Sequence, residues 1–233
     1  MIILGIDTST PATTVGLRLA EGPVLEARDD PGPGERPGHA TRLLGLTQDL
    51  LSRAGIGWGA LQRIAVGVGP GTFTGLRVGV ATARGLALAL GSELVGVSSL
   101  HALAHGAQNP HGTHERVLAI LDARRGEAFA AAYRDGREIA APRALTPTDL
   151  LELADELLVE GSWLAIGDGA LRFGEQLRAA GVKIPAESSP LHLISAAAIC
   201  DLGKCAPIAE PEMILPDYCR RPDAELALEA RAR

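Results

Sequence analysis

Aromatic residues and cysteines are scarce in this 233-residue chain. Aromatics make up only 3% of it, so the core has to be packed mainly with Leu, Val, Ile and Ala. The three cysteines, Cys200, Cys205 and Cys219, are too few for a disulfide framework, and their spacing matches no common zinc motif. The sequence therefore predicts reduced thiols, which suit the cytosol.

Long apolar runs and an excess of positive charge are also missing. No apolar run reaches the roughly 20 residues that a membrane helix needs, and the opening MIILGIDTST has no basic region typical of a secretory signal. The formal net charge of −6 argues against a stand-alone nucleic-acid-binding module, because backbone binding needs clustered Lys and Arg. We expect a cytoplasmic protein with no membrane contact that reaches nucleic acid only through a partner.

The patterns that are present predict an α/β protein. Short apolar runs between turn residues indicate strands, and leucines spaced three and four apart indicate helices. In the first half the expected elements are strands at 2–7, 14–19, 24–27, 64–68 and 94–97, and helices at 39–54, 75–90 and 99–107. This order predicts an antiparallel meander followed by alternating helices and strands.

The second half repeats the same plan. Its expected elements are strands at 117–122, 127–133, 138–143 and 164–167, and helices from Pro147, at 170–180 and at 191–202. We therefore divide the chain into a first subdomain at 1–100, a smaller second subdomain at 101–189 and a tail at 206–233. A helix within 190–205 is expected to fold back onto the first subdomain.

A carboxylate at the end of the first strand suggests a phosphate-binding hairpin. In Asp7-Thr8-Ser9-Thr10, the backbone N–H groups of the turn can hold phosphate, and Asp7 can hold a magnesium-bound water. However, Ser9 stands where a glycine would let phosphate come closer. On this motif alone the preferred interpretation is a polar β-turn capped by Asp7.

The densest glycine segment is GVGPGTFTGLR at 67–77, between a strand and a helix. Anions bind at such helix N-termini, but no Lys follows Gly75 where a P-loop requires it. Within the helix, small residues recur at every fourth position, namely Gly75, Gly79, Ala83 and Ala87. Such a line lets another helix approach closely, either from the same chain or from a partner.

Histidines gather after the last strand of the first half. His101, His105, His111, His114 and Glu115 lie within fifteen residues, and two His four apart on a helix can share one metal ion. The order supplies neither the third ligand nor the adjacent base of a catalytic zinc site. We therefore predict no intrinsic metal site.

The chain resembles the bacterial TsaB (YeaZ) family in four segments, which are IDTST at 6–10, GPGTFTGLR at 69–77, DARRGE at 122–127 and GDGA at 167–170. The order and spacing of these segments extend the resemblance over nearly the whole chain. It implies an actin-like ATPase fold (ASKHA, ribonuclease H-like) in which the two subdomains are related. It also places Asp122 to Arg125 where actin-like ATPases have a second phosphate loop.

The resemblance further implies a role as a non-catalytic subunit. In this family a TsaD-type subunit transfers the threonylcarbamoyl group to the adenosine next to the anticodon of tRNAs that read A-starting codons. A TsaE-type ATPase joins for turnover. The resemblance implies no intrinsic cofactor, with ATP or ADP at the interface with partners and tRNA bound only through the complex. The metal-binding histidines of TsaD relatives align with Ser99 and Leu103, so His101 and His105 are out of register.

Two other classes of function remain open. An independent actin-like ATPase or sugar kinase would need glycine-lined phosphate loops, and Ser9 and Arg124 stand against it. A metal-dependent, glycoprotease-like peptidase would need a complete set of metal ligands, which the histidine order does not supply.

We expect the partner to dock on two neighbouring helices, at 39–54 and 75–90. The predicted contact residues are Leu43, Leu46, Leu50, Gly75, Gly79, Ala83 and Ala87. Because the partner has related subdomains, equivalent helices can pair about a pseudo-twofold axis, and the isolated chain can self-dimerise through the same face. On this hypothesis Gly79→Leu abolishes partner binding and leaves the monomer folded.

Overall fold

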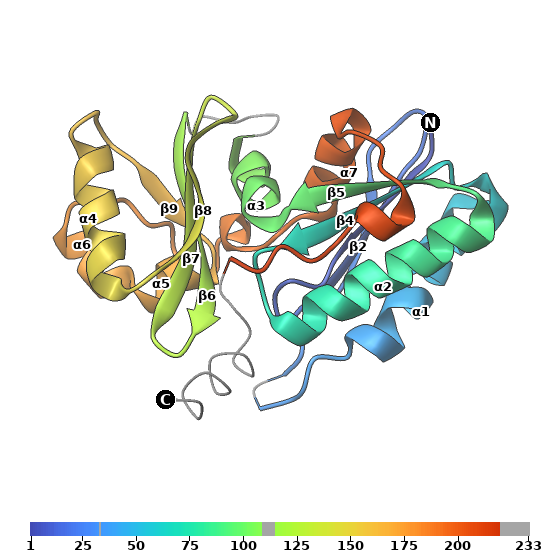
Figure 1. Ribbon diagram of the computed structural model, residues 1–233, viewed down its shortest axis with the longest axis horizontal. Coiled ribbons are helices and arrows are strands. Elements are labelled where there is room, and N and C mark those ends of the chain that lie inside the picture. Colours follow the sequence, from blue (N-terminus) through green and yellow to red (C-terminus); the bar gives the residue numbers. More distant parts are fainter. Residues whose placement is uncertain (33, 109–114, 220–233) are drawn as a thin grey trace.

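The computed structural model describes residues 1–32, 34–108 and 115–219, which form two α/β lobes side by side (Figure 1). The strands are β1 (Ile3–Asp7), β2 (Thr13–Arg18), β3 (Leu25–Asp29), β4 (Arg63–Gly69), β5 (Glu93–Ser98), β6 (Arg116–Arg124), β7 (Glu127–Arg134), β8 (Arg137–Leu145) and β9 (Leu164–Ile166). The helices are α1 (His39–Ala54), α2 (Phe73–Leu90), α3 (Ser99–Gln108), α4 (Pro147–Leu158), α5 (Asp168–Arg172), α6 (Gly174–Ala179) and α7 (Ala196–Cys205). One-turn 3₁₀ helices occur at Trp58–Ala60, Pro190–His192 and Pro211–Met213.

Each lobe is built on one sheet, and the two sheets share a plan. The first has the order β3-β2-β1-β4-β5, in which β1, β2 and β3 are antiparallel and β4 runs parallel to β1. The second has the order β8-β7-β6-β9, again with three antiparallel strands and a parallel fourth. This repeat confirms the α/β fold with two related subdomains.

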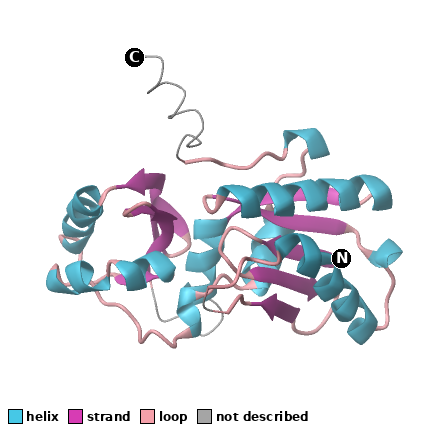
Figure 2. Ribbon diagram, turned by 90° about the horizontal axis from the view of Figure 1, so that it is seen from below, coloured by secondary structure: helices cyan, strands magenta, loops and turns pink. Residues whose placement is uncertain are grey.

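Alternation along the strands places apolar side chains on both faces of each sheet. In β1, Ile3 belongs to the core between the lobes, whereas Leu4 packs with residues of α1 and α2. Helices α1 and α2 cover one face of the first sheet, and α7 covers the other (Figures 1 and 2). Because α3 contacts strands of both sheets, it packs between the two lobes.

Two expected helices differ from what the sequence indicated. The helix expected at 170–180 is two short helices, α5 and α6, which meet at Phe173 and Gly174. The helix expected from Leu191 begins at Ala196, because the Ser195 hydroxyl caps it by accepting hydrogen bonds from the amides of residues 197 and 198. Apolar spacing alone could not distinguish this loop from a helical turn.

Helix α2 is the one described helix that is long and apolar enough to span a membrane by length and composition. In the fold it packs along β4 and β1, with Gly79 and Ala83 buried against the sheet. Arg77 and Arg84 are its only charged residues.

Candidate functional site

Asp7, at the end of β1, is fully enclosed by its own chain. One carboxylate oxygen accepts hydrogen bonds from the Ser9 amide (3.0 Å) and hydroxyl (2.7 Å), and the other accepts one from the Ser99 hydroxyl (3.0 Å). Burial raises the pKa of this carboxyl, and the bonds from Ser9 counter that effect. A Cβ at Gly67 would lie 1.9 Å from an Asp7 oxygen, so only glycine fits there.

The rest of the predicted phosphate hairpin is fastened to the glycine loop. The Thr8 hydroxyl donates to the Gly75 carbonyl at 2.7 Å, and the Thr72 amide donates to the Ser9 carbonyl at 2.7 Å. A Cβ at Gly71 would lie 2.4 Å from that same Ser9 oxygen. The glycines therefore let the loop press directly against the hairpin, and both Thr8 and Ser9 are buried beneath it.

The turn between β6 and β7 consists of two arginines and one glycine, Gly126. Arg124 and Arg125 adopt left-handed backbone conformations, with φ of 63° and 53°. The Asp122 carboxylate accepts hydrogen bonds from the Arg124 amide (2.8 Å) and the Arg172 guanidinium (2.9 Å). The Asp122 amide donates to Asp168 at 2.9 Å, and burial raises the pKa of Asp168.

An open cavity of about 240 Å³ lies between the lobes, and Thr10 and Asp168 both line it. It thus joins the tip of the β1–β2 hairpin to the start of α5, two segments that the sequence singled out separately. His192, Arg28 and Asp30 complete its polar lining. Of the predicted hairpin residues, Thr10 borders this cavity, whereas Asp7, Thr8 and Ser9 face inward. A role for the hairpin in phosphate binding remains a prediction.

The two described histidines of the cluster lie on α3. The His101 ring stacks on Tyr133, with ring centres 5.0 Å apart, and the His101 and His105 rings are perpendicular. Burial lowers the pKa of both histidines. Across residues 1–32, 34–108 and 115–219, no three His, Cys, Asp or Glu side chains gather as a metal site would require; His111 and His114 lie outside these ranges.

The tail contributes contacts that the sequence did not predict. The Asp217 amide donates to the Val68 carbonyl at 2.7 Å, which fixes the tail beside the glycine loop. The Tyr218 hydroxyl accepts a hydrogen bond from Arg77 at 3.0 Å, and its ring lies 5.1 Å from that of Phe73. Because aromatic residues are rare in this chain, Tyr218 and Phe73 are the residues from which a contact between the tail and α2 could have been inferred.

Most of the predicted partner contacts are not exposed, and their role in partner binding stays a prediction. Gly75, Gly79, Ala83 and Ala87 are all buried in the chain's own core, as are Leu43 and Leu50, and Leu46 is half-buried. A Cβ at Gly79 would lie 2.3 Å from the Thr8 hydroxyl oxygen, so this glycine accommodates the β1–β2 hairpin. Both faces of α2 are rich in small and apolar residues, so the sequence could not show which face is buried.

Comparison with known proteins places these features in a family. Residues 36–187, more than half of the chain, match the family model described as "TsaD: tRNA N6-adenosine threonylcarbamoyltransferase". The TsaB protein of Escherichia coli, a tRNA threonylcarbamoyladenosine biosynthesis protein, is 39% identical over 176 residues, which cover 72% of each chain.

Solved structures agree with this result. YeaZ from Pseudomonas aeruginosa superposes with a TM-score of 0.76 at 32% identity, covering 93% of this chain and 99% of that one. A ROK hexokinase from Thermus thermophilus superposes with a TM-score of 0.51 at 14% identity, covering 87% of this chain and 99% of that one. At that identity the hexokinase shows the fold alone, which is the actin-like one.

Proposed function

The chain belongs to the TsaB (YeaZ) family of tRNA threonylcarbamoyladenosine biosynthesis proteins, and from this premise we propose that it is a non-catalytic cytoplasmic subunit. It binds and activates a TsaD-type subunit, which transfers the threonylcarbamoyl group. A TsaE-type ATPase joins this complex, with ATP or ADP at the shared interface, and tRNA is held by the complex as a whole.

The observation that carries the proposal is the engagement of Asp7 by its own chain. In an actin-like ATPase this carboxylate would serve magnesium and phosphate, but here the Ser9 and Ser99 hydroxyls occupy both of its oxygens. The glycine loop fills the space beside Thr8 and Ser9. These contacts support an anchoring role for Asp7, in place of a catalytic one.

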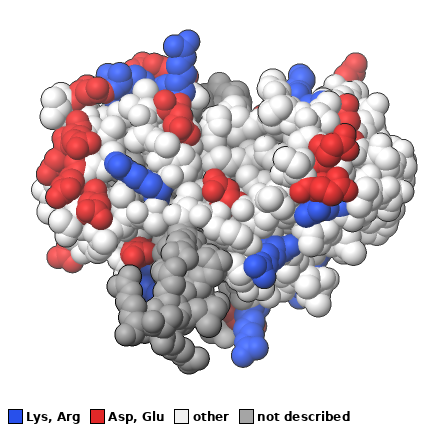
Figure 3. Space-filling view, viewed as in Figure 1, with Lys and Arg blue, Asp and Glu red and all other residues white. Residues whose placement is uncertain are grey.

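The surface of the first lobe supports a partner-binding role. Of the ten large hydrophobic residues exposed in the described parts of the chain, six lie on α1, α2 and the tail: Leu44, Phe73, Leu88, Ile208, Met213 and Leu215. Figure 3 shows white surface around α2 that is interrupted by a few basic and acidic groups, and the last 3₁₀ turn packs against this helix. An apolar area of this kind is typical of a protein interface. We therefore place the TsaD-type subunit on the outer face of α1 and α2.

The role in tRNA modification is tested by deleting the gene and measuring nucleosides. We expect the deletion to lower threonylcarbamoyladenosine strongly in tRNAs that read A-starting codons, and a plasmid copy of this chain to restore it. Mass spectrometry of digested tRNA gives the amount directly. Normal modification in the deletion strain would contradict the assignment.

A further inference from the structure

The tail that follows α7 is fastened to the first lobe at three points. The Ala209 amide donates to the Leu94 carbonyl at 3.2 Å, so the tail pairs briefly with β5 at the edge of the first sheet. The Ile214 side chain is 8% exposed and belongs to the core that α2 covers. The Asp217 amide donates to the Val68 carbonyl at 2.7 Å. These contacts give the tail a defined course from β5 to the glycine loop.

The anchors turn neighbouring apolar side chains outward. Ile214 has an extended backbone, with φ of −79° and ψ of 100°, in which successive side chains point to opposite sides. With Ile214 inside, Leu215 is 60% exposed, and Met213 and Ile208 are 72% and 55% exposed. The last 3₁₀ turn packs against α2. Ile208, Met213 and Leu215 therefore form an apolar ridge beside the exposed apolar face of that helix, which we call the tail ridge.

The end of the described tail is held by a contact among three side chains at the start of α2. The Arg77 Nε donates to the Tyr218 hydroxyl at 3.0 Å, and the Tyr218 and Phe73 ring centres are 5.1 Å apart. The guanidinium carbon of Arg77 lies 3.8 Å from the centre of the Phe73 ring. Ring pairs and cation–π contacts of this kind are attractive. Because Tyr218 directly follows Asp217, this contact supports the third anchor.

We propose that Tyr218 is a positioning residue for partner binding, which holds the tail ridge beside α2 as part of the surface that receives the TsaD-type subunit. The inference rests on the proposed function. Exposure of Met213 and Leu215 does not stabilise the isolated chain, whereas large apolar side chains are typical of the buried centre of an interface. A ridge that is ordered before binding also avoids the entropy cost of ordering it during binding.

The contact made by the tail ridge is tested with a double variant, Met213→Asp with Leu215→Asp. Isothermal titration calorimetry with the TsaD-type subunit should show binding at least about tenfold weaker, because two charges would be buried in the interface. Ile139→Asp is the matched control, since Ile139 is 47% exposed on β8 in the other lobe, and it should bind like the wild type.

The outcomes of this titration separate the inference from its premise. Unchanged binding by the folded double variant would overturn the inference alone. A wild-type chain that binds no TsaD-type subunit would overturn the proposed function and the inference together. Because the substituted side chains are exposed, all variants should keep the thermal transition of the wild type, which circular dichroism measures.

Two substitutions at Tyr218 test positioning. Tyr218→Phe keeps the ring against Phe73 and should bind within about threefold of the wild type, whereas Tyr218→Ser loses both contacts and should bind at least about fivefold more weakly. Hydrogen exchange of the Asp217 amide measures the fraction of molecules with a docked tail. The dissociation constant should rise by the factor by which this fraction falls. A lower docked fraction with unchanged affinity would contradict the proposal.

Combining the substitutions distinguishes positioning from direct contact. In a chain that already carries Met213→Asp and Leu215→Asp, Tyr218→Ser should weaken binding no further, because the ridge that it positions no longer binds. Full additivity of the two effects would mean that Tyr218 acts independently of the tail ridge, and the positioning role would be wrong.

Discussion

At the residue scale, the buried carboxylate of Asp7 links three segments that are far apart in sequence. It joins β1 to the following turn through Ser9 and to α3 through Ser99, and Gly67 of β4 packs directly against it. A buried acceptor with fitted donors contributes to stability because removing it leaves those donors unpaired.

This arrangement predicts different outcomes for two substitutions at Asp7. Asp7→Asn keeps the shape and an acceptor for Ser9, and its amide can donate to the Ser99 hydroxyl, so it should stay folded and support tRNA modification in the deletion strain. Asp7→Ala should lose about 3 kcal/mol of unfolding free energy, because the Ser9 and Ser99 donors lose their acceptor. Urea denaturation and nucleoside analysis measure the two effects. If a stably folded Asp7→Asn fails to support modification, the carboxylate has a chemical role.

Histidine burial predicts how stability depends on pH. Burial lowers the pKa of His39, His101 and His105 below the ordinary 6.5. The unfolded chain therefore binds more protons, and these groups favour unfolding as the pH falls below about 6.5. Asp7 and Asp168, whose pKa values are raised, act in the opposite sense. The folded chain holds their protons more tightly, so these two groups favour unfolding as the pH rises above about 3.8.

The histidine contribution can be isolated with His101→Phe, which keeps a ring against Tyr133. Between pH 5 and 7 the unfolding free energy of this variant should rise less steeply with pH than that of the wild type. The two buried carboxyls are common to both proteins and cancel in the comparison. Identical slopes would mean that His101 titrates normally in the folded state.

At the scale of a single element, α2 has two faces with different tasks. Its inner face carries glycines at positions 75 and 79, because Thr8 of the β1–β2 hairpin lies directly against them. Its outer face includes Gly85, where an added Cβ would meet no atom within 4 Å, and Leu88, which is 66% exposed.

The same substitution on the two faces should therefore have opposite effects. Gly79→Ala should lose about 1–3 kcal/mol of unfolding free energy, because its Cβ would overlap the Thr8 hydroxyl. Gly85→Ala should gain up to about 1 kcal/mol, because alanine favours the helix and has room. Denaturant titration of the isolated chain compares them. This replaces the earlier expectation that Gly79→Leu leaves the monomer intact; a stable Gly79→Leu protein would contradict the packing described here.

At the scale of the whole molecule, the chain crosses between the lobes and returns. Helix α7 packs on the face of the first sheet that α1 and α2 leave uncovered. The fit is close, since a Cβ at Gly16 would lie 2.8 Å from the Cβ of Ala196. The first lobe therefore needs residues from both ends of the sequence.

The partner surface gives the prediction at this scale. Leu88→Asp places a charge on the outer face of α2 and should weaken binding of the TsaD-type subunit at least about tenfold, as for a central interface residue. Val159→Asp is the matched control, since Val159 is 87% exposed in the other lobe. Isothermal titration calorimetry measures both affinities. Undiminished binding by a folded Leu88→Asp would move the interface off α2.

The sequence by itself determined the class of fold, most element positions and the family. Alternating apolar residues, turn residues and helical leucine spacing are local properties, so α1 could be placed at its observed bounds. The glycine loop could be recognised because glycine is required wherever backbones approach closely. The sequence also indicated the hairpin at Asp7 and the turn at Arg124 as separate features.

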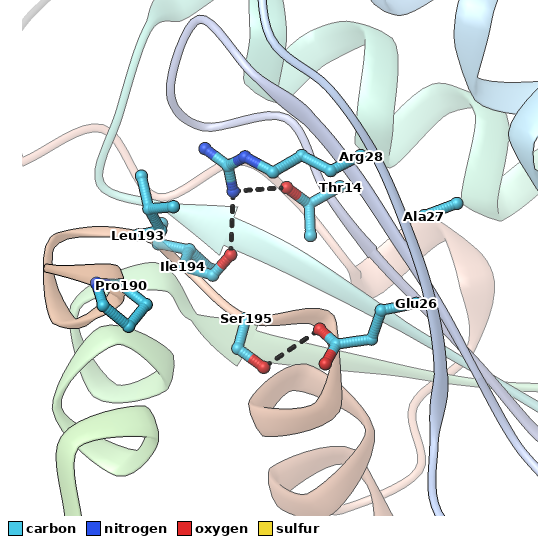
Figure 4. A pocket seen from close by; sticks show the side chains of 8 residues that line it. All are labelled: Thr14, Glu26, Ala27, Arg28, Pro190, Leu193, Ile194 and Ser195. Carbon is cyan, nitrogen blue, oxygen red and sulfur yellow. Dashed lines mark hydrogen bonds between the residues drawn. The ribbon is translucent and has the colours of Figure 1, made fainter. Parts of the chain in front are cut away.

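Only the tertiary structure decided how these features are used. It buried Gly79 against Thr8 and left Gly85 outside, although both lie on one helix with similar neighbours. It also paired Asp7 with Ser99, ninety-two positions away, and Arg28 with Ile194, 166 positions away (Figure 4). Periodicity reports that a helix has an apolar face, but which of two similar faces is buried depends on contacts between distant segments, and those contacts form only in the folded chain.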